Sequence, residues 1–291
     1  MSENGSAMQN GPIQNGPIED GPMEDGTEPR PPTSLRVAVA GKGGAGKTTF
    51  SATLARLMAR RGKRVIVIDG DSNPNVAVAL GVDREEAGAI QPLPTTLISR
   101  RLTGGTALKD PVETVIKEYG AKAPGDIDVL MMAMPSHADE GCLCTAHAVV
   151  SGLLNDVGTD AETVTILDLE ASPEHLSRGT TRHVDVLFLV VEPYYRSYET
   201  ARRMAALAAE LPISRVGVIA NKLRQPAHIA AIAEFCERHG LHLDGHLPWS
   251  DAVLDADLVG TPLFEYDTDG AVVAAVDQVA ENLLSLPLVR Q

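Results

Sequence analysis

Aromatic residues are scarce in this chain of 291 residues, since Phe, Trp and Tyr together make up only 3% of it. The core therefore has to be built from Val, Leu, Ile and Ala, a composition that suits a parallel sheet covered by helices. Long apolar runs are absent as well. No stretch reaches the roughly 20 apolar residues that a membrane-spanning helix needs, so we expect no membrane association.

Positive charge is also in short supply. The chain has 25 Lys and Arg residues against 39 Asp and Glu residues, which gives a net charge of −14. A protein that coats DNA or RNA needs a dense Lys/Arg surface to neutralise phosphates. The charge balance therefore argues against a nucleic-acid partner.

Cysteine is limited to Cys142, Cys144 and Cys236. An odd number of cysteines, without a basic and apolar leader at the N-terminus, is not the pattern of a secreted disulfide-bonded protein. We expect a cytoplasmic protein whose reduced thiols are available to a metal or to redox chemistry.

The composition divides the chain into two parts. Residues 9–28 repeat a pentapeptide with drift (QNGPI, QNGPI, EDGPM, EDGTE), and the recurring Gly-Pro prevents regular structure. Because this stretch has little apolar surface to bury, residues 1–33 are predicted to be a disordered tail. Residues 34–291 are predicted to form one domain.

Apolar runs rich in β-branched residues recur in that domain, at residues 35–40, 64–69, 127–133, 163–168, 184–191 and 215–220. Their continuous hydrophobicity predicts strands buried on both faces. Helical patterns lie among them, at residues 47–61, 197–211, 226–238 and 270–284. This alternation predicts an α/β fold, with a single doubly wound and mostly parallel sheet flanked by helices. Ligands of such sheets bind at the carboxyl ends of the strands.

The first predicted strand is followed by GKGGAGKTT and then by a predicted helix. This is the P-loop pattern G-x-x-x-x-G-K-[ST] in the strand–loop–helix context that it requires. Its backbone N–H groups and the helix N-terminus are suited to the phosphates of ATP. We expect Lys47 to contact the β- and γ-phosphates and Thr48 to ligate Mg²⁺. The predicted nucleotide-binding residues of this loop are Gly41, Lys42, Gly43, Gly44, Ala45, Gly46, Lys47, Thr48 and Thr49.

The early lysine of the loop, Lys42, resembles that of the deviant Walker A ATPases, the class of P-loop proteins that includes MinD, ParA and the nitrogenase iron protein. The resemblance implies a homodimer that closes face to face around ATP, with Lys42 crossing the interface to the partner's nucleotide. A cation supplied in this way neutralises charge on the transferred phosphoryl group. The alternative for Lys42 is a solvated loop lysine.

Two acidic residues fit the same resemblance. Asp71, in VIVIDGDSNPN, matches the switch I aspartate that positions the attacking water, and Asp168, in TILDLEASPEHL, matches the Walker B aspartate that holds the Mg²⁺ shell through water. An acid at the end of an apolar strand is often only a helix cap, but two of them beside a P-loop favour a nucleotide site. Asp69 is ambiguous, with support of the loop as one interpretation. Glu170 lies in switch II, where it could couple nucleotide state to the dimer face.

Recognition of adenine is predicted for Asn221 and Lys222, at the end of RVGVIANK, and for Pro248, in LPWSDAVLDADLVGTPL. An amide can donate to and accept from the adenine edge at once, and both segments resemble those that contact adenine in this class. The alternative for Asn221 is an ordinary turn residue at a strand end.

Cys142 and Cys144 are separated by one residue, so in an extended segment both thiols can point the same way and bind one metal ion. The pair offers two ligands, whereas a closed zinc site needs four. A face-to-face dimer would complete an S₄ set. The alternative is a pair of small buried thiols.

Two segments, GCLCTAHAVVSGLL and the later ILDLEASPEHLSRGTTRHVDVLFLVVEPYYRSYETARRMAAL, resemble those of the CooC-type nickel-insertion ATPases. The resemblance covers about residues 35–284. It departs from their pattern at Ser72 and Ser172, neither of which replaces a charged or metal-binding group. The resemblance implies Ni²⁺ or Zn²⁺ bound by Cys142 and Cys144 at the dimer interface, and a client metalloenzyme such as nickel carbon monoxide dehydrogenase. The predicted function is therefore that of an ATP-dependent metallochaperone.

The other potential metal ligands are expected to be structural. His239, His242 and His246 fit a solvated helix end and strand entry. His137 and His147 could be auxiliary ligands, but a surface position is the favoured interpretation for both. Cys236 is predicted to lie in the core.

Two other functions compete with the metallochaperone. A MinD/ParA-type positioning or partition ATPase would need a basic amphipathic C-terminal helix or a basic DNA-facing surface, and the C-terminal ENLLSLPLVRQ fits poorly. A reductase like the nitrogenase iron protein would need two widely separated cysteines for a shared Fe–S cluster.

Overall fold

The computed structural model describes residues 34–71, 73–100, 106–133, 144–157 and 160–287. Two compact units make up the chain, Met1–Pro31 and Pro32–Gln291, and every described residue belongs to the second. The predicted tail (residues 1–33), Ser72, His137 and Cys142 lie outside the described residues.

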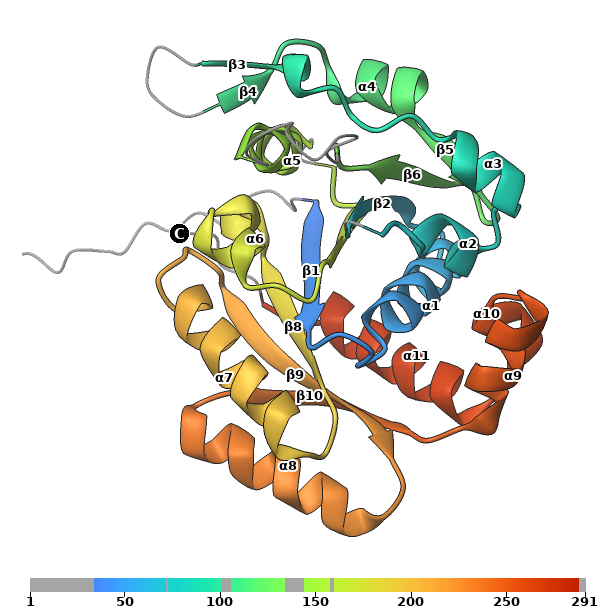
Figure 1. Ribbon diagram of the computed structural model, residues 1–291, viewed down its shortest axis with the longest axis vertical. Coiled ribbons are helices and arrows are strands. Elements are labelled where there is room, and N and C mark those ends of the chain that lie inside the picture. The colour runs from blue at the N-terminus through green and yellow to red at the C-terminus, as the bar shows by residue number, and fades with distance from the viewer. Residues whose placement is uncertain (1–33, 72, 101–105, 134–143, 158–159, 288–291) are drawn as a thin grey trace, which may run out of the picture. The chain divides into compact units, whose positions relative to one another are not determined.

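The second unit is built on an eight-stranded sheet with the order β10–β9–β8–β1–β7–β2–β6–β5 (Figure 1). All neighbouring strands are parallel except β5 and β6. A separate antiparallel pair is formed by β3 and β4. The strands are β1 (Leu35–Gly41), β2 (Arg64–Gly70), β3 (Ile98–Arg100), β4 (Thr106–Leu108), β5 (Ala121–Ala123), β6 (Ile127–Met131), β7 (Thr163–Leu169), β8 (Val186–Val191), β9 (Arg215–Leu223) and β10 (His242–Pro248).

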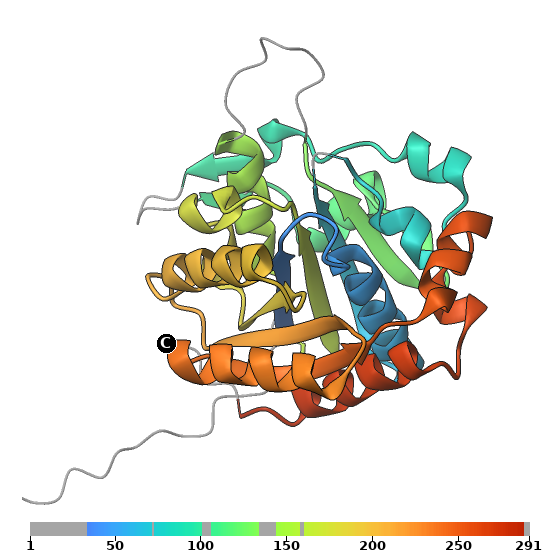
Figure 2. The same cartoon turned by 60° about the horizontal axis from the view of Figure 1, so that its bottom comes forward.

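Helices cover both faces of the sheet (Figures 1 and 2). One face carries α1 (Lys47–Arg60), α2 (Val76–Leu80) and α11 (Ala271–Leu284), and the other carries α4 (Val112–Tyr119), α5 (Cys144–Asp156), α7 (Tyr195–Ala208) and α8 (Pro226–His239). The shorter helices are α3 (Arg84–Ala89), α6 (Glu174–Ser177), α9 (Asp251–Val259) and α10 (Leu263–Tyr266), with 3₁₀ turns at Thr95–Leu97 and Thr180–His183. Among the described residues, no helix is both long and apolar enough to cross a bilayer.

The central strands are buried on both faces, which explains their unbroken apolar sequences. In β1, Val37 and Val39 join the apolar cluster beneath α1 and α11, whereas Ala38 and Ala40 join the cluster beneath α5 and α7. The predicted doubly wound fold is confirmed, and each of the six predicted strands is present, as β1, β2, β6, β7, β8 and β9.

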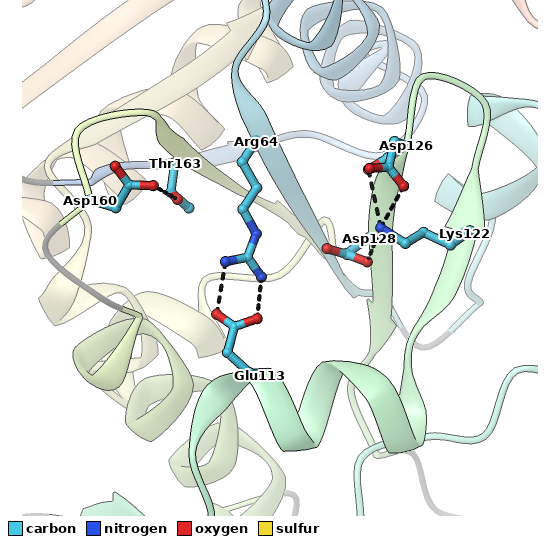
Figure 3. Close-up of polar contacts among 7 residues, drawn as sticks. All are labelled: Arg64, Glu113, Lys122, Asp126, Asp128, Asp160 and Thr163. Atoms are coloured by element: carbon cyan, nitrogen blue, oxygen red, sulfur yellow. Dashed lines mark hydrogen bonds and ion pairs between the residues drawn. The ribbon is translucent and has the colours of Figure 1, made fainter.

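Ion pairs tie peripheral elements to the amino ends of the strands, at the edge opposite the P-loop (Figure 3). Arg64, the first residue of β2, donates two hydrogen bonds of 2.8 and 2.6 Å to the carboxylate of Glu113 on α4. The Nζ of Lys122 on β5 lies 2.7 Å from Asp126 and 2.8 Å from Asp128. Partly exposed ion pairs of this kind add little to the free energy of unfolding. Their main effect is therefore to orient α4 and β5 rather than to stabilise the sheet.

Candidate nucleotide and metal sites

The predicted nucleotide-binding residues meet at one edge of the sheet. Gly41 ends β1, Asp71 follows β2 directly, and Asp168 is the second-last residue of β7. These strands are neighbours, and Asp168 pairs in register with Asp69 of β2. Because parallel strands end at the same edge, residues more than a hundred positions apart in the sequence lie side by side.

The loop between β1 and α1 depends on two glycines. Gly44 and Gly46 have φ angles of 77° and 96°, in the left-handed region that favours glycine. A Cβ atom at Gly46 would lie 2.4 Å from Nδ2 of Asn221, so a larger residue would displace that side chain. Lys47 begins α1 and is 7% exposed. The first N–H groups of α1 have no partner within the helix, which makes this terminus suited to phosphate oxygens.

Asp168 is the most deeply buried acid of the site, at 1% exposure. Its carboxylate accepts hydrogen bonds from Thr48 Oγ1 at 2.7 Å and from Ser51 Oγ at 2.8 Å. Burial raises the pKa of Asp168 to about 7, and the hydrogen bond from Thr48 opposes that effect. A divalent cation would favour the charged form of such a carboxyl. The side-chain oxygens of Thr48 and Asp168 therefore fit Mg²⁺, which prefers hydroxyl, carboxylate and water ligands.

Asp69 and Asp71 have different surroundings. The carboxylate of Asp69 accepts three backbone N–H groups, from Asp71 at 3.1 Å and from Asn75 and Val76 at 2.9 Å each. It therefore supports the loop after β2. Asp71 is only half-buried and accepts a hydrogen bond from the N–H of Asn73 at 2.9 Å. Asp71 stays the predicted residue for orienting water.

The predicted adenine residues Asn221, Lys222 and Pro248 line a small cavity of about 90 Å³ beside the P-loop, together with Trp249. Nδ2 of Asn221 donates to the carbonyl of Ala45 at 2.7 Å, and its Oδ1 accepts the N–H of Lys222 at 2.8 Å. The amide thus joins β9 to the P-loop and keeps one N–H for a base. Its role in reading adenine stays a prediction.

Cys144 is the first residue of α5 and is exposed, so the alternative of a buried thiol is wrong for this residue. It is disulfide-bonded in the structure, and a metal-binding thiolate requires its reduction. Its Sγ lies 2.8 Å from a guanidinium nitrogen of Arg178, in the segment that follows α6. Within the described part of the chain, no cluster of three or more His, Cys, Asp or Glu side chains is arranged to hold a metal.

The predicted surface position of His147 is wrong. His147 is 3% exposed, because its helix, α5, lies on the sheet and turns this residue inward. Its ring packs edge-to-face against His175, with centroids 4.4 Å apart, and its Nδ1 is hydrogen-bonded to Thr180 Oγ1 at 2.9 Å. His175 Nε2 donates to the carbonyl of Gly70, between Asp69 and Asp71, at 3.0 Å. The two rings connect α5 to the end of β2.

The third cysteine is buried and the three clustered histidines are on the surface. Cys236 is 3% exposed in the core, as predicted, and burial raises the pKa of its thiol to about 11. His239, His242 and His246 are exposed.

Two site residues escaped the sequence analysis although the sequence carries a signal for each. Ser51 lies three residues after Thr48, a spacing that places both hydroxyls on one face of α1. Glu192 directly follows the buried strand β8, as Asp71 follows β2, and an acid in that position reaches the same edge of the sheet. Arg178 and His175 gave no such signal.

The sequence model of the CobQ/CobB/MinD/ParA nucleotide binding domain matches residues 37–263, from β1 to α10. The chain belongs to this family. The match spans the P-loop and both predicted switch aspartates, so the protein is a P-loop ATPase, as predicted.

Comparison with individual proteins agrees with this assignment. The chain is 35% identical to the carbon monoxide dehydrogenase accessory protein CooC of Rhodospirillum rubrum over 239 residues, which cover 79% of this chain and 90% of CooC. It is 33% identical to an uncharacterised ATP-binding protein of Methanocaldococcus jannaschii, over 87% of this chain and 98% of that protein. The cell division ATPase MinD of Pyrococcus furiosus has a TM-score of 0.65 at 19% identity, over 86% of this chain and 98% of MinD. At that identity the likeness to MinD shows the fold alone.

The buried ring of His175 predicts a pH dependence of stability. Burial, and then the nearby His147, lower the pKa of His175 to about 4 from the ordinary 6.5. Between these values the unfolded chain binds a proton that the folded chain does not, so the free energy of unfolding falls as the pH falls from 6.5 to 4, by at most about 3 kcal/mol from this residue. Urea denaturation at pH 7 and pH 4.5 measures the free energy of unfolding of wild type and of His175→Gln. The wild-type value minus the His175→Gln value should be lower at pH 4.5 than at pH 7.

Gln at position 175 can still donate to the Gly70 carbonyl but does not titrate. His242→Gln, at an exposed position, is the control and should follow wild type at both pH values. A wild-type-minus-His175→Gln difference that is constant with pH would show that the folded protein binds a proton at His175 as readily as the unfolded chain.

Proposed function

We propose that this ATPase is a metallochaperone: two copies close around ATP, hold one Ni²⁺ or Zn²⁺ between their Cys142 and Cys144 thiolates, and deliver it to a client metalloenzyme. The observation that carries the proposal is the exposed Cys144 at the start of α5, in contact with Arg178 of the segment beyond the nucleotide-binding Asp168. The extensive similarity to CooC, named as an accessory protein of carbon monoxide dehydrogenase, supports a nickel enzyme as the client. A reducing compartment, such as the cytoplasm, suits the thiols.

In the proposed ATP hydrolysis, each side chain of the nucleotide site has its own task. Lys47 neutralises the β- and γ-phosphates, and the Asp71 carboxylate orients the attacking water. Thr48 and Asp168 would hold Mg²⁺, the latter through water, and the ion would offset the negative charge that develops on the phosphates. Asn221 and Pro248 contact the base.

Lys42 completes the site of the partner copy. The P-loop follows β1 at the carboxyl ends of the strands, and in the proposed dimer this end of the sheet faces the second copy. A lysine supplied across the interface makes hydrolysis depend on dimer formation, because neither copy alone has the full set of cations around the phosphates.

The metal is cargo, and its two half-sites explain how it can be released. A C-x-C pair supplies two thiolates, so a closed tetrahedral site needs the pairs of both copies. The guanidinium of Arg178 beside Cys144 attracts the thiolate form that binds metal. Metal binding and dimer formation then strengthen each other by the same factor. Hydrolysis that opens the dimer would split the ligand set and free the ion for the client.

Asp71→Ala should bind Mg-ATP about as tightly as wild type but lose at least about a hundredfold in turnover, because the water loses the group that orients it. Calorimetry measures the binding and steady-state phosphate release measures the turnover. Asp269→Ala, an exposed aspartate outside the site, is the matched control and should hydrolyse ATP normally. Parental activity in Asp71→Ala would remove Asp71 from the catalytic machinery.

Reduced, anaerobically purified protein should hold one soft metal ion per dimer, and the Cys142→Ser/Cys144→Ser double variant should hold none. Cys236→Ala is the matched control, since that thiol is buried away from the site, and it should keep the metal. Metal content per chain, by mass spectrometry with and without ATP, gives the answer. The affinity for the metal should weaken as the pH falls, because protons compete with the metal for the thiolates.

Equal metal content in the double variant and wild type would place the metal elsewhere and contradict the proposal. ATP-dependent dimers that bind no metal at any cysteine would favour the alternative, a MinD/ParA-type positioning or partition ATPase. The fold that this chain shares with MinD supports that alternative.

A further inference from the structure

Lys42 lies against an aromatic ring of its own protomer. Its Nζ is 5.7 Å from the centroid of Tyr194, within the roughly 6 Å reach of a cation–π interaction. Although it sits on a glycine-rich loop, Lys42 is half-buried. Lys42, which is proposed to reach the partner's nucleotide, therefore has a contact within its own chain.

The ring that meets Lys42 is itself fixed. Tyr194 precedes α7, and its hydroxyl donates to Oε2 of Glu192 at 2.7 Å. The N–H of Tyr194 also donates to the carbonyl of Glu192 at 2.8 Å. Burial, and then the hydrogen bond from the hydroxyl to Glu192, raise the pKa of Tyr194 to about 12, so the hydroxyl stays protonated at neutral pH. Tyr194 is 39% exposed, whereas the next residue, Tyr195, is 77% exposed.

Glu192 joins this ring to the nucleotide site. The residue is 9% exposed, and its second oxygen, Oε1, lies 2.9 Å from Nζ of Lys222. The same Nζ donates to the carbonyl of Gly44 in the P-loop at 2.5 Å. Lys222 also lines the cavity predicted for the base. One buried carboxylate thus contacts both a lysine that lines this cavity and the hydroxyl of the tyrosine whose ring lies beneath Lys42.

We propose that Tyr194 and Glu192 are positioning residues for Lys42: the ring holds the ammonium within its own protomer in the absence of nucleotide, and Glu192 holds the ring. The proposal rests on the role of Lys42 at the partner's nucleotide. A contact present only in the open monomer opposes transfer of the lysine, so it raises the protein concentration that ATP-driven dimerisation requires. Formation of one dimer breaks two such contacts, so its free-energy cost is twice that of a single contact.

The resting contact is tested in nucleotide-free protein by the rate of acetylation of Lys42 with acetic anhydride, followed by peptide mass spectrometry. Tyr194→Ala should raise that rate about two- to fivefold, the range expected for loss of one exposed cation–π contact. Tyr194→Phe keeps the ring and should stay close to wild type, and Tyr195→Ala, which removes the neighbouring ring, should not differ from it. Wild-type reactivity of Lys42 in Tyr194→Ala would overturn the proposal.

The consequence for dimerisation is measured by sedimentation in an Asp71→Ala background with Mg-ATP, so that the nucleotide persists. Adding Tyr194→Ala should lower the dimer dissociation constant about five- to thirtyfold, since two contacts are lost per dimer. Adding Tyr195→Ala should not lower it. A dimer weakened equally by both alanine variants would show that the rings serve only as interface surface, against the proposal.

The two measurements also separate this proposal from the function on which it rests. If ATP dimerises none of the variants, including the parent, the role of Lys42 across an interface is wrong. The acetylation rates, obtained without nucleotide, would still decide whether Tyr194 holds Lys42.

Discussion

A carboxylate buried beneath the P-loop constrains how the nucleotide site is built. Asp168 is 1% exposed at the end of the central strand β7, where a charge needs donors or a cation to replace water. Thr48 and Ser51 provide those donors from the first turns of α1, which fixes the helix N-terminus over β7. That attachment places the P-loop at the N-terminus of α1, where backbone N–H groups suit phosphate oxygens, and leaves side-chain oxygens suited to Mg²⁺. Asn221 then joins the loop by donating to the carbonyl of Ala45, and the absence of a Cβ atom at the next residue, Gly46, leaves room for its amide.

A second layer of contacts connects this site to α5. His175 donates to the Gly70 carbonyl beside Asp71, and His147 packs on His175 from α5, three residues after Cys144. Arg178 reaches Cys144 itself. These contacts run from the end of β2 to the first turn of α5, so they join the predicted switch I segment to the proposed metal ligand Cys144.

The elements that could be predicted from the sequence are those whose surroundings in the fold restrict which residues they can contain. Strands buried on both faces require unbroken apolar runs, and the glycine-rich loop has few other uses, so the six central strands and the P-loop were predictable. The edge strand β10, with the sequence HLDGHLP, is half-exposed and carries no such run. His147 was misplaced because the helix over Cys144–Asp156 was not expected, and without it nothing turns that residue inward. The contacts of Glu192 with Lys222 and Tyr194 depend on where β8 and β9 end relative to each other, which only the folded chain shows.

The most direct test of the shared site mixes two variants that are each inactive alone. A Lys42→Ala protomer retains its own Lys47 and Asp71, and an Asp71→Ala partner can lend it Lys42. If Lys42 acts across the interface, mixing equal amounts restores up to about a quarter of the wild-type rate of ATP hydrolysis, because half of the dimers are mixed and each has one complete site. A mixture as inactive as its components, or a Lys42→Ala protein that hydrolyses ATP at the parental rate alone, would contradict a site shared between two copies.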